Sequence, residues 1–110
     1  AGIPVYNYMV AYKMPFFGGQ VMCHTSDLAL WFGSMEGAAY QYRGDETNAQ
    51  RVSNHMMDAL AAFAASGDPS CKLLKWAPYT TDAHNTMVFD VKSGCKVDFD
   101  RAVYEAMMNQ

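Results

Sequence analysis

Residues 4–12 are a run of nine positions in which β-branched and aromatic side chains dominate and both strand faces are nearly apolar. The run reads Pro-Val-Tyr-Asn-Tyr-Met-Val-Ala-Tyr. A strand that buries both faces is typical of the sheet of an α/β protein, because helices cover both sides of that sheet. The run therefore predicts an inner strand. If the chain stood alone, its remainder would have to cover both faces.

A long helix is the next clear signal in the sequence. Residues 47–50, Thr-Asn-Ala-Gln, match a capping box and so predict the helix start. Apolar side chains then recur at helical spacing, and polar ones fall mostly on the other side. Gly67, with Pro69 beyond it, predicts the end of the helix. The apolar positions are Val52, Met56, Leu60, Phe63 and Ala64.

The other elements are shorter. Pro15 and the pair Gly18-Gly19 predict a loop after the first strand. A short helix is expected over residues 27–32, capped by Thr25 or Ser26 and ended by Gly33. The remaining expectations are irregular chain over 35–45 and 66–81, a half-exposed strand over 86–92, and a final helix from Asp98 or Asp100 with Phe99, Val103 and Met107 on one face.

This order of strand, loop, short helix, long helix, strand and helix predicts the α/β class. Two strands without a pairing partner between them cannot form a stable sheet by themselves. The sequence therefore predicts an incomplete sheet.

Charge and composition exclude several classes of protein. Eight Lys and Arg residues against eleven Asp and Glu give a net charge of −3, and no basic stretch occurs, so no nucleic-acid partner is expected. No apolar run approaches the roughly 18–20 residues that span a bilayer, and residues 1–4 form no signal peptide, so no membrane partner is expected. An apolar content of 51% indicates a packed core.

Cysteine and histidine usage bears on compartment and metal binding. Cys23, Cys71 and Cys95 give an odd number and no CxxC pair. An odd number argues against a complete disulfide framework and favours a reducing compartment, so a cytoplasmic location is expected. The three histidines lie far apart and lack ligand spacing with any cysteine pair, so no metal site is expected.

The stretch most informative about function is residues 16–33, Phe-Phe-Gly-Gly-Gln-Val-Met-Cys-His-Thr-Ser-Asp-Leu-Ala-Leu-Trp-Phe-Gly. It places a single histidine, His24, on a glycine-containing loop after a strand. An acidic residue, Asp27, follows three positions later, and Trp-Phe-Gly closes the unit. A loop after a strand is where a histidine can reach into a site while the sheet fixes its base.

Three downstream motifs complete the pattern. They are Phe-Ala-Ala-Ser-Gly-Asp-Pro at residues 63–69, Trp-Ala-Pro-Tyr at 76–79 and Met-Val-Phe at 87–89. Together with residues 16–33, they resemble the C-terminal end of the type-B carboxylesterases, the α/β-hydrolase family that includes para-nitrobenzyl esterases and cholinesterases. The resemblance covers nearly the whole chain.

The resemblance implies that residues 1–110 are a single segment, the C-terminal part of an α/β-hydrolase domain. It implies a serine carboxylesterase with a Ser-Asp/Glu-His triad in which His24 is the catalytic base. Since the triad runs Ser, acid, His along such chains, the nucleophile and the acid lie upstream. The implied partners are a small-molecule carboxylic ester and the N-terminal remainder of the polypeptide, and no cofactor is implied.

The sequence departs from the family pattern at three places. The family usually has glycine directly after its histidine, where this chain has Thr25. Leu60 stands where a tryptophan is common, and residues 76–79 carry one residue more than the usual Trp-Pro-x-Tyr. These departures indicate a divergent, bacterial member, and they bear on substrate preference more than on His24.

Several residues near His24 allow more than one interpretation. Asp27 is interpreted as a helix-start residue, and a supporting role for the histidine stays open. Cys23 beside His24 is expected to be a small, partly buried cysteine, because adjacent side chains diverge and a Cys–His catalytic pair must converge. Phe16, Phe17, Met22 and Trp31 either line an acyl or alcohol pocket or pack in the core.

The missing parts of the triad limit the predicted activity. No Gly-x-Ser-x-Gly motif and no HGGG-type loop occur, so the isolated 110-residue chain is expected to be inactive. The alternative hypothesis is a non-catalytic structural or interaction module derived from the same fold. The two-sided apolar strand also predicts a homodimer or higher oligomer for the isolated chain, or else a loosely packed state.

Overall fold

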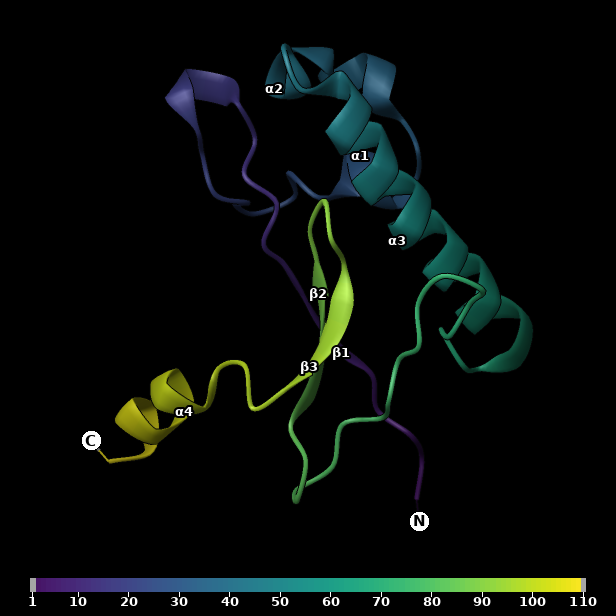
Figure 1. Cartoon of the computed structure of the whole chain (residues 1–110), viewed down its shortest axis with the longest axis vertical. Helices are drawn as coiled ribbons and strands as arrows, with labels where there is room; N and C mark the ends of the chain where they lie inside the picture. Colours follow the sequence, from purple (N-terminus) through teal and green to yellow (C-terminus); the bar gives the residue numbers. More distant parts are fainter. Residues whose placement is uncertain (1, 110) are drawn as a thin grey trace.

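The computed structural model describes residues 2–109 (Figure 1). A small mixed sheet packs with helices, and the predicted α/β class is confirmed. In chain order the elements are β1 (Asn7–Val10), the 3₁₀ helix η1 (Phe16–Gly18), α1 (Leu28–Trp31), the 3₁₀ helix η2 (Met35–Ala38), α2 (Ala39–Tyr42), α3 (Glu46–Ser66), β2 (Asn85–Phe89), β3 (Gly94–Val97) and α4 (Arg101–Met108).

The sheet has three strands in the order β1-β2-β3. β1 and β2 pair in parallel, with Tyr8 opposite Met87 and Val10 opposite Phe89. β2 and β3 pair antiparallel, with Met87 opposite Cys95. The expectation that the two predicted strands would lack partners is therefore wrong, because they pair with each other across most of the chain length.

β1 is half exposed, which corrects the prediction that both of its faces are covered. Tyr8 and Met9, which are consecutive and so point to opposite faces of the strand, are 44% and 42% exposed, and Asn7 and Val10 are only partly buried. Within residues 2–109, β2 is the only strand that pairs with β1. The opposite edge of β1 and part of its apolar surface are consequently open.

β2 is more buried than its alternating sequence predicts. Thr86, Met87, Val88 and Phe89 are all buried, because β2 lies between the other two strands. The side-chain amide of Asn7 donates to the Thr86 hydroxyl (3.0 Å), which satisfies this polar group inside the sheet. The half-exposed interpretation of residues 86–92 is therefore wrong for residues 86–89.

α3 begins earlier than the predicted capping box. The helix starts at Glu46 with Asp45 in the N-cap position, so Thr47 lies inside the first turn. The Asp45 carboxylate accepts hydrogen bonds from the Tyr12 hydroxyl (2.9 Å) and the Asn48 amide (2.7 Å) instead of capping the helix. The predicted stop at Gly67 is confirmed, since Gly67 is left-handed (φ 77°) and its N–H donates to the Phe63 carbonyl.

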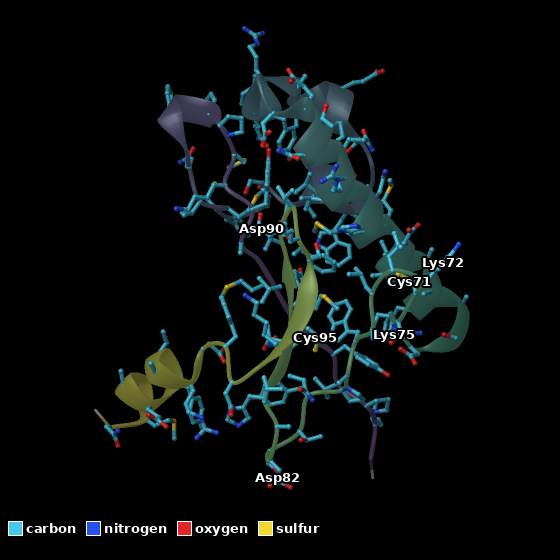
Figure 2. The ribbon with its side chains drawn as sticks, in the orientation of Figure 1. Cys71, Lys72, Lys75, Asp82, Asp90 and Cys95 are labelled. Atoms are coloured by element: carbon cyan, nitrogen blue, oxygen red, sulfur yellow. The ribbon has the colours of Figure 1, made fainter. Side chains whose placement is uncertain are left out.

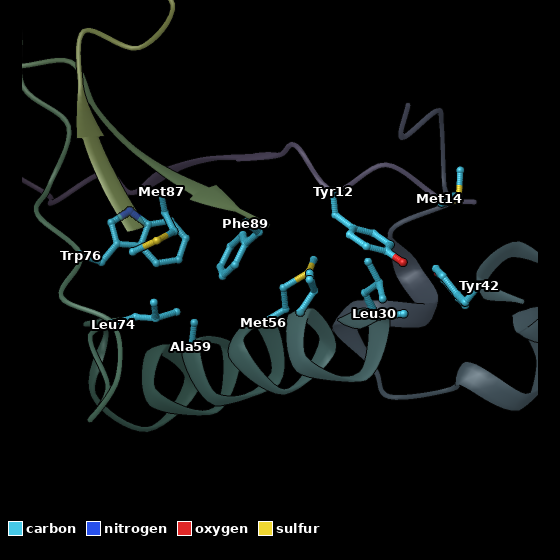
Figure 3. Packing of buried hydrophobic residues seen from close by; sticks show 12 residues of the cluster. Tyr12, Met14, Leu30, Tyr42, Met56, Ala59, Leu74, Trp76, Met87 and Phe89 are labelled. Atoms are coloured by element: carbon cyan, nitrogen blue, oxygen red, sulfur yellow. The ribbon is translucent and has the colours of Figure 1, made fainter. Parts of the chain in front are cut away.

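The core lies between α3 and the sheet (Figure 3). Val52 and Met56 of α3 are buried as predicted, whereas Leu60 and Phe63 are 37% and 48% exposed. Phe89 of β2 is the centre of an aromatic cluster, with edge-on contacts at 5.4–6.1 Å between ring centroids. Such edge-to-face pairs add to the stabilisation from burial. The partners of Phe89 are Tyr8, Trp31 and Trp76.

Residues 35–45, predicted to be irregular, contain η2 and α2. Tyr42, at the end of α2, is buried and its ring lies 6.4 Å from that of Tyr12. Gly33, which precedes this region, ends α1 as predicted. A Cβ at Gly33 would lie 2.6 Å from the Met57 sulfur, a contact that the flexible methionine side chain can relieve by moving, so the positive φ of 64° is what favours glycine here.

α4 lies away from the rest of the fold (Figure 1), and no residue of the helix is buried. It begins after Asp100, as predicted. Val103 and Met107 are 62% and 69% exposed, so the predicted apolar face has no covering element among residues 2–109. The helix connects to the sheet through His84, which stacks on Tyr79 and contacts Tyr104 edge-on.

A second histidine joins α3 to the turn between β2 and β3. His55 Nδ1 lies 3.0 Å from the Ser93 hydroxyl, and Ser93 bonds to both backbone groups of Asp90 in that turn. Figure 2 labels Asp90. Burial lowers the pKa of His55, so the neutral ring is favoured here. The Ser93 hydroxyl uses its proton in the bond to the Asp90 carbonyl (2.7 Å), so it does not donate to His55. The contact therefore serves to link α3 to the turn.

Candidate functional site

The loop that carries His24 leaves the carboxyl end of β1 and returns on itself. Met14 and Gln20 form two backbone hydrogen bonds that close the excursion (2.9 and 2.8 Å). Phe17, Gly18 and Gly19 between them all have positive φ, which reverses the chain direction. Glycine adopts such angles without steric cost, so the Gly-Gly pair accounts for this local shape. His24 follows and is exposed to solvent.

His24 lies in a tight turn formed by residues 23–26. The Ser26 N–H donates to the Cys23 carbonyl (3.1 Å), which closes the turn. Thr25 has a φ of 66°, whereas φ is not positive at His24. A positive φ at the third position is the mark of a type II turn, where glycine is the favoured residue. The glycine of the family pattern therefore corresponds to a position whose backbone is left-handed.

The Ser26 side chain bonds to Cys23 on the other side of His24. Its hydroxyl accepts from the Cys23 N–H (2.9 Å), donates to the Cys23 carbonyl (2.7 Å) and lies 3.3 Å from the Met22 sulfur. The prediction that Ser26 or Thr25 caps the following helix is wrong, because Asp27 occupies the N-cap position and no side chain caps it.

Tyr42 of α2 holds the same turn from a distant part of the sequence. Its hydroxyl donates to the Ser26 carbonyl (3.3 Å). Burial, together with the nearby Asp27 carboxylate, raises the pKa of Tyr42 to about 12, so the phenol stays protonated and remains a donor. No pattern in the sequence predicted this contact, which joins residues 16 positions apart.

A hollow of about 420 Å³ lies beside His24. It is lined by Tyr8, Met9 and Val10 of β1 and by Met22, Cys23, Thr25 and Asp27 of the histidine turn and its flanks. Of the residues predicted either to line a pocket or to pack, only Met22 reaches this hollow. Phe16 packs against the core, and Phe17 is 88% exposed.

A second hollow, of about 340 Å³, lies on the α1 and α3 side of β1. We call it the aromatic hollow. Trp31 lines it, and Tyr8 is shared with the hollow beside His24. Its aromatic side chains are Tyr6, Tyr8, Trp31, Phe32, Phe63 and Trp76.

The neighbours of His24 take up the predicted positions only in part. Asp27 starts α1, as expected, and lines the hollow beside His24 without a hydrogen bond to the histidine ring. Cys23 is exposed, so the prediction that it is partly buried is wrong. Cys71, in the loop after α3, and Cys95, on β3, are also free thiols (Figure 2).

The described residues also bear on metal ions and membranes as partners. Across residues 2–109, no three His, Cys, Asp or Glu side chains gather where they could hold a metal ion. No helix in that part of the chain is long and apolar enough to cross a membrane.

The geometry is therefore an exposed histidine on a tight turn at the carboxyl end of a strand, beside a hollow. A profile of the carboxylesterase family matches residues 1–107. The chain belongs to the carboxylesterase family. The resemblance to type-B carboxylesterases inferred from residues 16–33, 63–69, 76–79 and 87–89 is thereby confirmed.

Solved carboxylesterase structures share this fold. Carboxylesterase EST55 of Geobacillus stearothermophilus has 27% sequence identity to this chain over 94% of its residues, with a TM-score of 0.79. An esterase from anaerobic Clostridium hathewayi, described as hydrolysing aliphatic aromatic polyesters, is 26% identical over 93%, with a TM-score of 0.81. A thermophilic PNB esterase, 19% identical with a TM-score of 0.82, shows the fold alone.

The matched region is a small part of those carboxylesterases. This chain covers 20% of the Clostridium enzyme and 22% of EST55, so it spans about a fifth of their length. A comparison with curated protein sequences found no match. The α/β-hydrolase fold predicted for the chain is confirmed over the 93–94% that superposes.

Proposed function

We propose that this chain is the part of a serine carboxylesterase that supplies the catalytic histidine, His24. The observation that carries the proposal is the exposed position of His24 at the carboxyl end of β1, in a chain of the carboxylesterase family. In ester hydrolysis His24 takes the proton of the nucleophilic serine and returns it to the leaving alcohol. This reaction uses side chains and backbone N–H groups only, so the proposal includes no cofactor.

The serine and the acidic member of the triad belong, in this proposal, to the preceding part of the same polypeptide. The open edge of β1 supports this assignment, because its backbone groups can pair with one more strand. The aromatic hollow beside that edge supports it too, since Phe32 and Phe63 there are 68% and 48% exposed. Apolar side chains of the preceding segment would fill the hollow and complete the core.

A non-catalytic module is the second candidate. One observation favours it: among the contacts of residues 2–109, the His24 ring has no hydrogen-bond partner, as is common for surface histidines. In the proposed esterase, the partner of the ring is the acidic residue supplied by the preceding segment. Activity measurements on the longer protein separate the two candidates.

The test is His24→Ala in the full-length polypeptide that carries this chain, assayed with short-chain nitrophenyl esters. We expect kcat to fall by roughly 10⁴-fold or more with little change in stability, because triad members act as a unit. Asp27→Asn should be milder and affect mainly stability. His55→Ala is the matched control, because His55 lies in the structural contact with Ser93 and should leave kcat nearly unchanged.

Two results would contradict the assignment. Full activity of the His24→Ala protein would remove His24 from the chemistry and favour the non-catalytic module. Equal losses of kcat in His24→Ala and Asp27→Asn would make Asp27 a triad partner, contrary to its place at the helix start.

The isolated 110-residue chain should hydrolyse nitrophenyl esters no faster than free imidazole. A base without its nucleophile and oxyanion hole retains almost none of the transition-state stabilisation. The measurement is initial rate against ester concentration, with imidazole at equal concentration as the control. Saturable hydrolysis that a serine-directed inhibitor abolishes would reveal a nucleophile within this chain.

A further inference from the structure

We infer that Ser26 is a positioning residue for His24. Its hydroxyl holds the backbone of Cys23, on the N-terminal side of His24, and so restricts the direction in which the histidine ring points. The inference rests on the proposed role of His24 and adds to it a residue that neither the motif nor the family pattern singles out.

The hydrogen bonds of Ser26 converge on Cys23, the residue before His24. The hydroxyl accepts from the Cys23 N–H (2.9 Å) and donates to the Cys23 carbonyl (2.7 Å). That carbonyl belongs to the peptide unit that joins Cys23 to His24. Because a peptide unit is planar, fixing its oxygen fixes the N–Cα bond of His24, and the backbone bond that closes the turn (Ser26 N–H to the Cys23 carbonyl, 3.1 Å) limits rotation about that bond. Without the Ser26 hydroxyl, the hydrogen bond from the Ser26 N–H to the Cys23 carbonyl would be the only one left between these two residues, and the turn would be less rigid.

The site of this contact is sheltered from water. Ser26 is only 8% exposed, while the neighbouring His24 is exposed. Removing a buried hydroxyl leaves its former hydrogen-bond partners unpaired, and the protein is destabilised by the desolvation free energy of those groups. The carbonyl of Ser26 is itself held by the Tyr42 hydroxyl (3.3 Å), which ties the turn to α2. The turn is therefore anchored to the helical layer of this chain.

Thr25 makes such an anchor necessary. A threonine at φ 66° is strained, because a β-branched side chain crowds the left-handed backbone. Strain of this kind persists only where the surroundings hold the backbone in place. The contacts made by Ser26 surround this residue and keep the turn in its observed shape.

The experiment compares Ser26→Ala, Ser26→Thr and Ser53→Ala in the full-length polypeptide, with a nitrophenyl ester as substrate. Ser53 is the matched control. It is fully buried, and its hydroxyl donates to the Leu30 carbonyl (2.8 Å), so Ser53→Ala removes a comparable hydrogen bond without touching the histidine turn. The measured quantities are kcat, KM and the change in the thermal unfolding midpoint of each variant relative to the unaltered protein.

We expect Ser26→Ala to lower kcat roughly 10- to 100-fold while KM changes less than about twofold, because misplacing a catalytic group by about 1 Å costs about this much. Ser26→Thr keeps the hydroxyl and should recover most of the rate. Ser53→Ala should lose similar stability with kcat nearly unchanged.

Three results would overturn the inference: kcat of Ser26→Ala within twofold of the unaltered protein, an equal fall of kcat in Ser53→Ala, or no recovery in Ser26→Thr. His24→Ala separates this inference from the proposed function. If His24→Ala is inactive and Ser26→Ala is not, the positioning role is wrong and the catalytic role stands. If both proteins are fully active, the proposed function itself is wrong.

Discussion

Thr25 occupies a backbone conformation that suits glycine. Its φ of 66° lies in the left-handed region, where an L-residue with a Cβ is disfavoured by about 1–2 kcal/mol. The residue also adjoins His24, so any relaxation of the backbone there would change the direction of the histidine ring. Threonine at this position thus combines local strain with a place beside the candidate catalytic group.

Replacing Thr25 by glycine should stabilise the chain. Relief of the left-handed strain exceeds the extra freedom that glycine gives the unfolded chain, so we expect the free energy of unfolding to rise by about 0.5–1 kcal/mol. Urea unfolding of the full-length polypeptide, followed by tryptophan fluorescence at one fixed protein concentration, measures this change. Thr25→Ala is the control, because it keeps the Cβ and should gain less than half as much. A lower stability of Thr25→Gly would show that the threonine side chain makes stabilising contacts that outweigh the strain.

The sequence predicted some residues of the candidate site and missed others for a physical reason. His24 and Asp27, selected by their place after a strand and by the resemblance of residues 16–33 to the type-B carboxylesterases, both line the hollow beside the turn, and the catalytic role of His24 stays a prediction. Ser26 was assigned to the following helix, since serine before a helix is usually a cap. Its actual bonds run backwards to Cys23, and its carbonyl binds Tyr42, a contact that depends on how α2 packs.

At the scale of elements, α4 is the least supported helix. It has eight residues, and isolated helices shorter than about 12–15 residues are marginal in water. Its attachment depends on His84, which stacks on Tyr79 (5.1 Å between ring centroids) and lies 3.4 Å from the Asp98 carboxylate. Asp98 in turn pairs with Arg101 in the first turn of the helix.

His84→Ala should therefore loosen α4 without unfolding the sheet. We expect amide hydrogen exchange in residues 101–108 to become roughly tenfold faster, since an aromatic pair contributes about 0.5–1.5 kcal/mol beyond its buried area. Exchange of the β2 amides should stay the same. His55→Ala is the control, because it changes the contact between α3 and Ser93 and should leave α4 exchange unaltered. Unchanged exchange of α4 in His84→Ala would mean that other contacts hold the helix.

Long elements were predicted better than short ones. α3 was found because its 21 residues repeat a helical pattern and Gly67 ends it. β3 was missed, since an alternation of only three residues, Cys95, Lys96 and Val97, is too short to predict a strand. Its position depends on the turn formed by Asp90 and Ser93. The parallel pairing of β1 with β2 was also missed, because it joins distant segments and no local pattern encodes the partner of a strand.

At the scale of the whole molecule, the chain is more extended than its length requires. Its radius of gyration is 14.9 Å, whereas a compact domain of this length has about 13 Å. α4, which lies away from the sheet and has no buried residue, extends the chain. The open edge of β1, the aromatic hollow and the uncovered face of α4 also leave large apolar side chains exposed, among them Phe32, Phe63 and Met107.

We therefore expect the isolated 110-residue chain to be a dimer or higher oligomer, or else loosely packed. Pairing of β1 edges would satisfy backbone groups that this chain leaves unpaired. Light scattering and near-UV circular dichroism measure the mass and the packing. Met9→Lys places a charge on the exposed part of β1 and should shift an edge-paired oligomer toward monomer, whereas Val103→Lys on α4 should not. A monomer with a sharp aromatic signal and cooperative unfolding would contradict the expectation.

The parallel pairing of β1 with β2 also imposes a delay during synthesis between the two strands that pair. Asn7 and Thr86, which bond across the two strands, are 79 positions apart. At roughly 5–20 residues per second, the ribosome needs about 4–16 s after making β1 before it has made the partner of that strand. During those seconds β1 lacks its β2 partner, and only its other edge can pair with a strand of the preceding segment. Each molecule thus passes through an interval in which chaperones and other unfolded chains can bind to the edge of residues 4–12 that β2 later covers.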